Sequence, residues 1–322
     1  VIENGANAWV EGGNIWGCDM MGIYHISCVD SGRRDVLVGI DDLPARDRIQ
    51  YPLAIGNACQ NFLEENCTTV GGKEGFCLTV FGGNAQGVSR YIRYRGCTAY
   101  GAWRSGFCTH DTHEVIDYSD CVADRCEQGW DVRTRRVTIR NHRVYNTGQF
   151  SASLDCSIKL GSGVQDLVVS GGYAENVLRG IWMDKDIVHE LPPGNITVSD
   201  DVIRGSRAAY GALLQFNGGG DYADSQALGK LSMRNLDYEL KTTGSPNGVR
   251  ADGKWLDVEI QGTFRGGNAA TCVFLTRPDG DTDTVNGPVN PLVDAKYPST
   301  FADPLIQYAT GVKKQRVTGI GQ

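Results

Sequence analysis

Short runs of alternating hydrophobic and polar residues recur along this chain, and helical periodicity is nearly absent. Residues 92–95, 137–140 and 167–170 are clear examples of the alternation. A period of two residues indicates β-strands that bury one face. The segment 57–65 is the best candidate for a short helix. The pattern therefore predicts a protein built almost entirely of β-strands.

The predicted strands belong to a sequence repeat. In its clearest copies a polar turn residue precedes Cys67, Cys97 or Cys121, and a glycine–aromatic pair follows, as in Gly106-Phe107. Looser copies centre on Cys28, Val144, Tyr173, Val202 and Leu236. From residue 67 onward the copies are 23 to 34 residues apart. Such a repeat favours stacked coils over a β-sandwich. We predict an all-β fold, a right-handed single-stranded parallel β-helix.

Composition is consistent with a folded protein that has many tight turns. Glycine accounts for 42 of the 322 residues, well above its usual share of about 7%. The formal net charge of −7 argues against nucleic-acid binding, which needs basic surface patches. No apolar run reaches the length of about 18 residues that a membrane span needs. We therefore expect neither a nucleic-acid partner nor membrane insertion.

The 11 cysteines are an odd number, so at least one thiol stays unpaired in the monomer. Cys28, Cys67, Cys97 and Cys121 align with Val, Tyr and Leu of later copies, which predicts an inward column of buried, reduced thiols. Free thiols favour assembly in a reducing cytoplasm.

The repeat loosens toward the C-terminus, which suggests two regions. We expect residues 1–275 to form the β-helix and residues 276–322 to close the solenoid or mediate oligomerisation. Asp279, Asp281 and Asp283 offer alternating carboxylates for Ca²⁺, but no glutamate follows at calcium-loop spacing. A solvated loop is the favoured interpretation there, and no other cofactor or metal is expected.

Strand alternation also predicts which side chains point outward. If Phe107 and Trp130 face the core, one outer column contains His110, Arg133, Lys159, Asp184, Gln215 and Asp252, and a second contains Cys108, Asp131, Ser157 and Trp182. Cations can neutralise a uronate carboxylate, carboxylates or histidine can move protons, and an exposed tryptophan can stack on a sugar ring. The columns therefore predict a binding strip for an acidic polysaccharide.

Within this strip the densest chemistry is the segment 110–114, His-Asp-Thr-His-Glu. Its two histidines do not have the spacing of a helical zinc motif, and no third metal ligand is evident, so acid–base catalysis is favoured. The candidate catalytic residues are His110, Arg133, Lys159, Asp131, Asp184 and His113. The candidate substrate-binding residues are Trp182, Asp155, Asp111 and Gln215. Should the strip lie on the wrong face, His189 and Glu190 offer the next acid–base pair.

Residues 90–186 resemble the pectate-lyase-like right-handed parallel β-helix superfamily. The segment Gly-Phe-Cys-Thr-His-Asp-Thr-His-Glu, residues 106–114, is similar to stretches of mannuronan C5-epimerases and of bacteriophage tail spikes. In one alignment His110 matches the catalytic histidine and Asp111 the following acid, Cys108 replaces the catalytic aspartate, and Arg133 replaces another acid. In the other alignment residues 111–114 match Asp-Pro-His-Glu. The tail-spike resemblance implies a homotrimer that acts on bacterial surface polysaccharide, in the virion tail or as an extracellular protein.

The leading hypothesis is a tail-spike-like depolymerase of an acidic polysaccharide, with lyase chemistry slightly favoured. His110 or His113 would be the base, and Arg133 and Lys159 would neutralise the substrate carboxylate. One alternative is a glycoside hydrolase with a carboxylate pair from Asp131 and Asp184, or Asp155. The other is a non-catalytic receptor-binding or structural fibre module.

Overall fold

The structure is a computed structural model that divides into two compact units, residues 1–158 and 159–322. It describes residues 1–18, 21–40, 51–79, 87–110, 113–151, 153–161, 163–183, 191–216, 227–244, 246–266, 271–276, 292–296 and 307–308. Throughout this described part the regular elements are β-strands, and there is no helix that could cross a membrane. The expected helix over residues 57–65 is wrong, because Gln60–Glu65 forms strand β8 with alternating burial.

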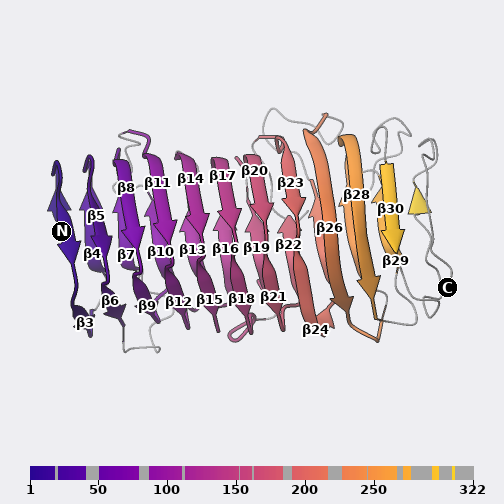
Figure 1. Cartoon of the computed structure of the whole chain (residues 1–322), viewed down its shortest axis with the longest axis horizontal. Coiled ribbons are helices and arrows are strands. Elements are labelled where there is room, and N and C mark those ends of the chain that lie inside the picture. Colours follow the sequence, from indigo (N-terminus) through magenta and orange to yellow (C-terminus); the bar gives the residue numbers. More distant parts are fainter. Residues whose placement is uncertain are drawn as a thin grey trace. The chain divides into compact units, whose positions relative to one another are not determined.

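The first unit contains three parallel ladders, and each coil contributes one strand to each ladder (Figure 1). The first ladder consists of β1 (Ile2–Glu3), β4 (Met21–Ile26), β7 (Tyr51–Gly56), β10 (Glu74–Thr79), β13 (Ser105–Thr109) and β16 (Gln128–Val132). The second consists of β2 (Trp9–Glu11), β5 (Gly32–Arg34), β8, β11 (Arg90–Arg95), β14 (Glu114–Ser119) and β17 (Arg135–Arg140). The third consists of β3 (Asn14–Trp16), β6 (Leu37–Gly39), β9 (Thr68–Val70), β12 (Thr98–Tyr100), β15 (Val122–Asp124) and β18 (Arg143–Tyr145).

The second unit repeats this arrangement. Its first ladder consists of β22 (Arg179–Met183), β25 (Tyr210–Gln215), β27 (Asn247–Asp252), β29 (Thr271–Thr276) and β31 (Gln307–Tyr308). The second consists of β20 (Gln165–Ser170), β23 (Ile196–Ser199), β26 (Lys230–Leu240), β28 (Leu256–Arg265) and β30 (Leu292–Lys296). The third contains β21 (Tyr173–Glu175) and β24 (Val202–Ala208), and the long strand β26 pairs with β24 as well. Strand β19 (Cys156–Leu160) spans the boundary between the units.

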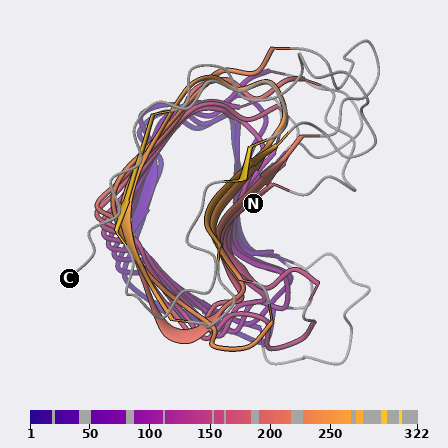
Figure 2. The same cartoon turned by 90° about the vertical axis from the view of Figure 1, so that its right-hand side faces the viewer.

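Successive strands of one ladder lie behind one another in the end-on view (Figure 2). Parallel ladders of this kind, three per coil, are the architecture of a parallel β-helix. The predicted fold class is confirmed. Parallel pairing continues beyond residue 275, since β30 and β31 pair with β28 and β29. Most of the segment 276–322, including Asp279, Asp281 and Asp283, lies outside the described residues. The expectations that this segment closes the solenoid or mediates oligomerisation, and that its aspartates form a solvated loop rather than a Ca²⁺ site, therefore stay predictions.

A two-residue corner joins the second ladder to the third in four successive coils of the first unit. The first corner residue has a left-handed backbone: Asn66, Gly96, Asp120 and Asn141 have φ angles of 52°, 59°, 56° and 51°. Glycine, asparagine and aspartate adopt this conformation at the lowest cost. The second corner residue is buried: Cys67, Cys97, Cys121 and His142. The polar-turn–cysteine repeat in the sequence is this corner.

The interior of the first unit is a stack of aromatic rings. Phe107 lies parallel to Phe76 and Trp130, with centroids 4.8 and 4.7 Å away, and Tyr94 stacks on Tyr118 at 4.6 Å. Phe107 also meets Tyr118 edge-on at 5.6 Å. Stacked and edge-on pairs at these separations stabilise a core beyond the area they bury. This stack accounts for the aromatic half of the glycine–aromatic repeat.

The glycine of that repeat is required by close packing at the start of each strand. A Cβ on Gly106 would lie 2.9 Å from the Cβ of Ala123 and 3.0 Å from the carbonyl oxygen of Gly129. Gly106 therefore points into the core, as does the following Phe107. Two consecutive inward residues interrupt the strict alternation at the beginning of the strand.

Thr98 pairs with Thr68 on one side and with Val122 on the other. The cysteines that directly precede these residues, Cys67, Cys97 and Cys121, therefore lie in one column, as predicted. Cys28 lies in a different column, since its N–H contacts Cys59 Sγ at 3.3 Å and Val29 pairs with Gln60.

The later members of the predicted column are wrong. Val144 pairs with Ala123, so His142 follows Cys121. Tyr173 and Val202 are half-buried and share a register with Asp237 rather than Leu236. The expectation failed because corner and strand positions both accept Val, Tyr or Leu, and sequence spacing alone does not separate them.

Charged groups also lie inside the first unit. Arg33 and Glu64 are fully buried and form an ion pair, and Arg33 NH1 donates to the carbonyl oxygen of Ile23 at 2.8 Å. The ring of His25 packs edge-on against Phe62 at 4.9 Å. Burial, followed by the charge of Arg33, lowers the pKa of His25 to about 3. The interior therefore holds a neutral histidine beside a buried ion pair.

Ten of the 11 cysteines, those whose side chains the structure describes, are free, and nine of these ten are buried. We predict that thiol titration in denaturant, with a chelator and without reductant, finds at least these ten thiols reactive. In native buffer the buried thiols should react far more slowly than Cys18, because the thiolate nucleophile must be exposed. Disulfides among these ten would contradict this prediction.

The buried histidines predict that acid destabilises the protein. Burial lowers the pKa of His142 to about 4, against an ordinary value of 6.5. Between these values the unfolded chain binds a proton that the folded chain does not, so the free energy of unfolding falls as pH falls from 6.5 toward 4. Denaturant unfolding across this range should show that decline, and His142→Gln should make it shallower. A variant as pH-sensitive as the wild type would contradict the assignment.

Candidate functional site

The outer face of the first ladder carries the side chains that alternate with the aromatic stack. Cys77 pairs with Cys108, and Cys108 pairs with Asp131 on the next strand. The predicted neighbouring positions of Cys108 and Asp131 are confirmed. Their predicted exposure is wrong, because each of these three residues is at most 1% exposed. Cys77 belongs to a buried cluster with Tyr24, Tyr51 and Ala54 on this outer face.

Asp131 is buried beneath two arginines. Arg133 Nε and NH2 donate to its two carboxylate oxygens at 3.0 and 2.7 Å, which is a bidentate pair. Arg104 NH2 lies 3.6 Å from Asp131 Oδ2, and Arg104 NH1 lies 3.6 Å from Glu74 Oε1. Both arginine side chains are 24% exposed, whereas both carboxylates are buried. The arginines thus form the accessible layer over the two acids.

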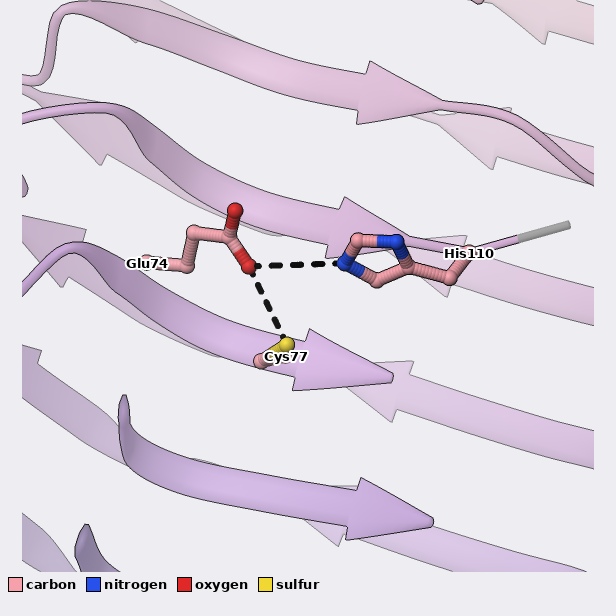
Figure 3. Close-up of side chains that lie close together, drawn as sticks. All are labelled: Glu74, Cys77 and His110. Carbon is pink, nitrogen blue, oxygen red and sulfur yellow. Dashed lines mark hydrogen bonds and ion pairs between the residues drawn. The ribbon is translucent and has the colours of Figure 1, made fainter. Parts of the chain in front are cut away.

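A second group of side chains adjoins this layer. Glu74 Oε2 accepts from the thiol of Cys77 at 3.1 Å and lies 3.8 Å from His110 Nε2. Figure 3 shows the Glu74 carboxylate between Cys77 and His110, which come from β10 and from the residue after β13. Cys108 Sγ lies 3.6 Å from the same His110 nitrogen. A carboxylate, an imidazole and two thiols therefore meet along the outer face of two neighbouring strands.

The charges of Glu74 and His110 stabilise each other. Burial raises the pKa of Glu74, but the hydrogen bond and charge of His110, the Cys77 thiol and Arg104 outweigh it and lower the pKa to about 2. Burial lowers the pKa of His110, whereas Cys108 and Glu74 raise it to about 10. At neutral pH this pair is an imidazolium and a carboxylate.

Several other predicted residues of the first unit lie in different surroundings. His113 is buried and its Nδ1 accepts from the backbone N–H of Ser89 at 3.1 Å. Burial and the charge of His110 lower the pKa of His113 to about 4, so it is neutral at pH 7. Asp155 is buried and accepts from the Thr147 hydroxyl at 2.5 Å. Asp111 lies outside the described residues.

The expected place of Ser157 beside Asp131 is wrong. A Cβ added to Gly106 would lie 3.0 Å from the carbonyl oxygen of Gly129, its neighbour in the next coil. In the same way, a Cβ added to Gly129 would lie 2.5 Å from the carbonyl oxygen of Ser157. Ser157 therefore follows Gly129 in the stack. That coil lacks the glycine–aromatic pair that sets the alternation elsewhere.

The remaining predicted residues belong to the second unit. The Lys159 ammonium lies 5.2 Å from the centre of the Trp182 ring, and the Arg179 guanidinium lies 4.4 Å from it. Trp182 is only 5% exposed, so the expected exposed ring for sugar stacking is wrong. Gln215 pairs with Asp252 as predicted and donates to its carboxylate at 2.7 Å. Asp184, His189 and Glu190 lie outside the described residues.

Glu74, Cys77 and Arg104 are site residues that sequence reasoning missed. Glu74 and Cys77 share the outer face although they are three residues apart, because Gly75 and Phe76 both point inward. Strict alternation therefore assigns Glu74 to the wrong face. The available signal was the repeat itself, in which Glu74 precedes a glycine–aromatic pair as Ser105 and Gln128 do.

Comparisons with known proteins support the fold. No protein-family model and no curated protein sequence matches the chain. The endo-xylogalacturonan hydrolase of Aspergillus tubingensis has a similar structure, with a TM-score of 0.51 and 11% identity over 94% of this chain and 92% of that one. An alginate lyase from Paenibacillus sp. str. FPU-7 has a TM-score of 0.37 and 13% identity over 89% of this chain and 92% of that one. The chain has a right-handed parallel β-helix fold.

The burial of Asp131 predicts a measurable effect on stability. Asp131→Asn removes the charge that Arg133 and Arg104 share, and we expect the free energy of unfolding to fall by about 1–3 kcal/mol. The matched control is Asp117→Asn, because the Asp117 side chain is 37% exposed and lies 3.5 Å from Arg140. We expect that control to cost less than about 1 kcal/mol. Equal losses in the two variants, measured by denaturant unfolding, would contradict the described burial.

Proposed function

We propose that this protein is a depolymerase that cleaves an acidic bacterial surface polysaccharide. The observation that carries the proposal is the pair of partly exposed guanidinium groups, Arg104 and Arg133, above two buried carboxylates. Arginine binds carboxylates in a planar, bidentate geometry. Equivalent residues of neighbouring coils stack about 4.8 Å apart, which suits an extended polymer.

The charge balance supports an anionic substrate. Glu74 and Asp131 contribute two negative charges, whereas Arg104, Arg133 and protonated His110 contribute three positive charges. The cations are also the more exposed members of the group. A uronate carboxylate that approaches this face would therefore meet positive charge first, which favours its binding.

Lyase chemistry is the favoured reaction. A base removes the C5 proton beside the uronate carboxylate, the C4–oxygen bond breaks, and an unsaturated sugar forms at the new end. Arg104 and Arg133 would stabilise the carboxylate as negative charge accumulates on it. His110 and His113 are the sequence-derived candidates for the base, but His110 is protonated at neutral pH and His113 is buried, which argues against both.

Glycoside hydrolysis is the second candidate, because Arg104 bridges the carboxylates of Glu74 and Asp131. A carboxylate pair is the usual machinery of that reaction. The likeness in fold to an enzyme described as an endo-xylogalacturonan hydrolase is compatible with it. The low pKa of Glu74 argues against its use as the proton donor at neutral pH, since that donor must be protonated.

The biological setting is also part of the proposal. The resemblance of residues 106–114 to bacteriophage tail spikes supports a place in a virion tail, assembly as a homotrimer in a reducing cytoplasm, and bacterial surface polysaccharide as the partner. A non-catalytic receptor-binding or structural fibre module is the alternative from a different functional class.

Product analysis on acidic capsular and alginate-like polymers tests the proposal. New ultraviolet absorbance from unsaturated ends indicates a lyase, and new reducing ends without that absorbance indicate a hydrolase. Arg133→Ala should lower turnover by about 10²- to 10³-fold, the usual cost of losing one charge-stabilising group. Arg140→Ala is the matched control, because Arg140 is an exposed arginine of the second ladder.

The control variant should retain wild-type turnover, and both variants should keep the β-sheet circular dichroism of the wild type. Normal turnover in Arg133→Ala would place the active site elsewhere. Absence of products from every acidic polymer tested, together with retained polymer binding, would instead favour the receptor-binding module.

A further inference from the structure

The thiols of Cys77 and Cys108 differ from six other buried thiols of the first unit in what they contact. Six buried cysteines direct Sγ toward a backbone carbonyl two or three residues earlier: Cys28, Cys59, Cys67, Cys97, Cys121 and Cys126. Cys77 Sγ instead contacts the Glu74 carboxylate, and Cys108 Sγ contacts the imidazole of His110. A simple packing role explains the six but does not require a carboxylate and an imidazole beside the other two.

Glu74, Cys77 and His110 approach the ligand separations of a tetrahedral metal site, and Cys108 adjoins them through His110. Glu74, Cys77 and His110 each offer a ligand atom, and the three atoms lie within 4.8 Å of one another. Zinc bonds of about 2.3 Å to sulfur and about 2.0 Å to nitrogen or oxygen place neighbouring ligand atoms roughly 3.3–3.8 Å apart. The contacts from Glu74 to Cys77 and to His110 are 3.1 and 3.8 Å, and that from Cys108 to His110 is 3.6 Å.

The surroundings also suit a bound cation. Glu74, Cys77 and Cys108 are each 1% exposed. Among these four residues only His110 is partly exposed, with 29% of its side chain accessible to solvent. Glu74 Oε1 is buried without a hydrogen bond, and Arg104 lies 3.6 Å from it. Carboxylates that bind a metal are usually held by a further polar partner, and Arg104 is close enough to Glu74 for this role.

We propose that Glu74, Cys77, Cys108 and His110 bind one Zn²⁺ ion. Two thiolates, an imidazole and a carboxylate are ligands that favour zinc over calcium or magnesium. On binding, the two thiols and the imidazolium release their protons to solvent, and the ion forms bonds to two sulfurs, one nitrogen and one oxygen. The ion would then link β10 with β13 and the residue that follows it, next to Arg104.

This inference does not rest on the proposed function. Ligation through Nε2 would occupy the His110 nitrogen that faces the group, so His110 could not act as the base through that atom. Arg104 and Arg133 would keep their proposed role toward the substrate, whereas His110 would no longer contribute a positive charge. A metal measurement therefore decides a question that is separate from whether the protein cleaves a polysaccharide.

The test uses the full chain. After removal of metals and titration with ZnCl₂, mass spectrometry of the elements should find one zinc per chain. Titration with CoCl₂ should give thiolate-to-cobalt charge-transfer absorbance and the visible bands of tetrahedral cobalt. Cys77→Ser and Cys108→Ser should each abolish the charge-transfer band from the changed sulfur. Each should also weaken metal binding by more than about 100-fold, because even the loss of a residue that only supports a ligand lowers metal affinity by about 10- to 100-fold.

Cys97→Ser and Cys121→Ser are matched controls, since both are buried thiols of the same unit outside the group. They should bind metal as the wild type does. His110→Ala provides a second test in case a serine variant fails to fold, because His110 is partly exposed and its removal leaves the core intact. Failure of the folded wild type to bind zinc, wild-type affinity in His110→Ala, or equal losses in the control variants would overturn the proposal.

Discussion

Every coil of the first unit must present its inward side chains to the same positions of the next coil, and this constraint governs the rest of the structure. Parallel strands in register leave no freedom to offset one ring from another, so Phe76, Phe107 and Trp130 stack face to face. Burial of such rings is the largest stabilising contribution that this interior offers. Any change of register in one coil would disrupt contacts with the coils on both sides.

The same register creates the candidate site. Because inward positions are fixed by packing, the alternate positions Cys77, Cys108 and Asp131 are brought side by side on the outer face. Two acids that would repel each other elsewhere are stabilised here by Arg104, Arg133 and His110. The polar chemistry is therefore buried with its partners, and only the arginines and one edge of the histidine reach solvent.

The sequence predicts the fold and part of the site, for identifiable reasons. The corner cysteines were predictable, because left-handed Asn, Gly or Asp followed by a buried residue leaves a repeated signature. The neighbouring positions of Cys108 and Asp131 followed from alternation after an inward ring. Glu74 was not predictable in this way, because Gly75 and Phe76 both point inward and reverse the alternation. Burial on the outer face was not predictable either, since Cys77, for example, packs with Tyr24 and Tyr51 of strands β4 and β7.

The two-residue corner also limits where this protein can change during evolution. Two residues always separate the second-ladder strand from the third-ladder strand in the four coils from β8 to β18, so an insertion there would break the stack. The connection from the first ladder to the second varies instead, with ten residues between Thr79 and Arg90 and two between Val132 and Arg135. Those connections begin where the first-ladder strands end, beside His110 and Arg133. A change in the length of these connections can therefore alter the surface beside His110 and Arg133, while the solenoid that supports them keeps its register.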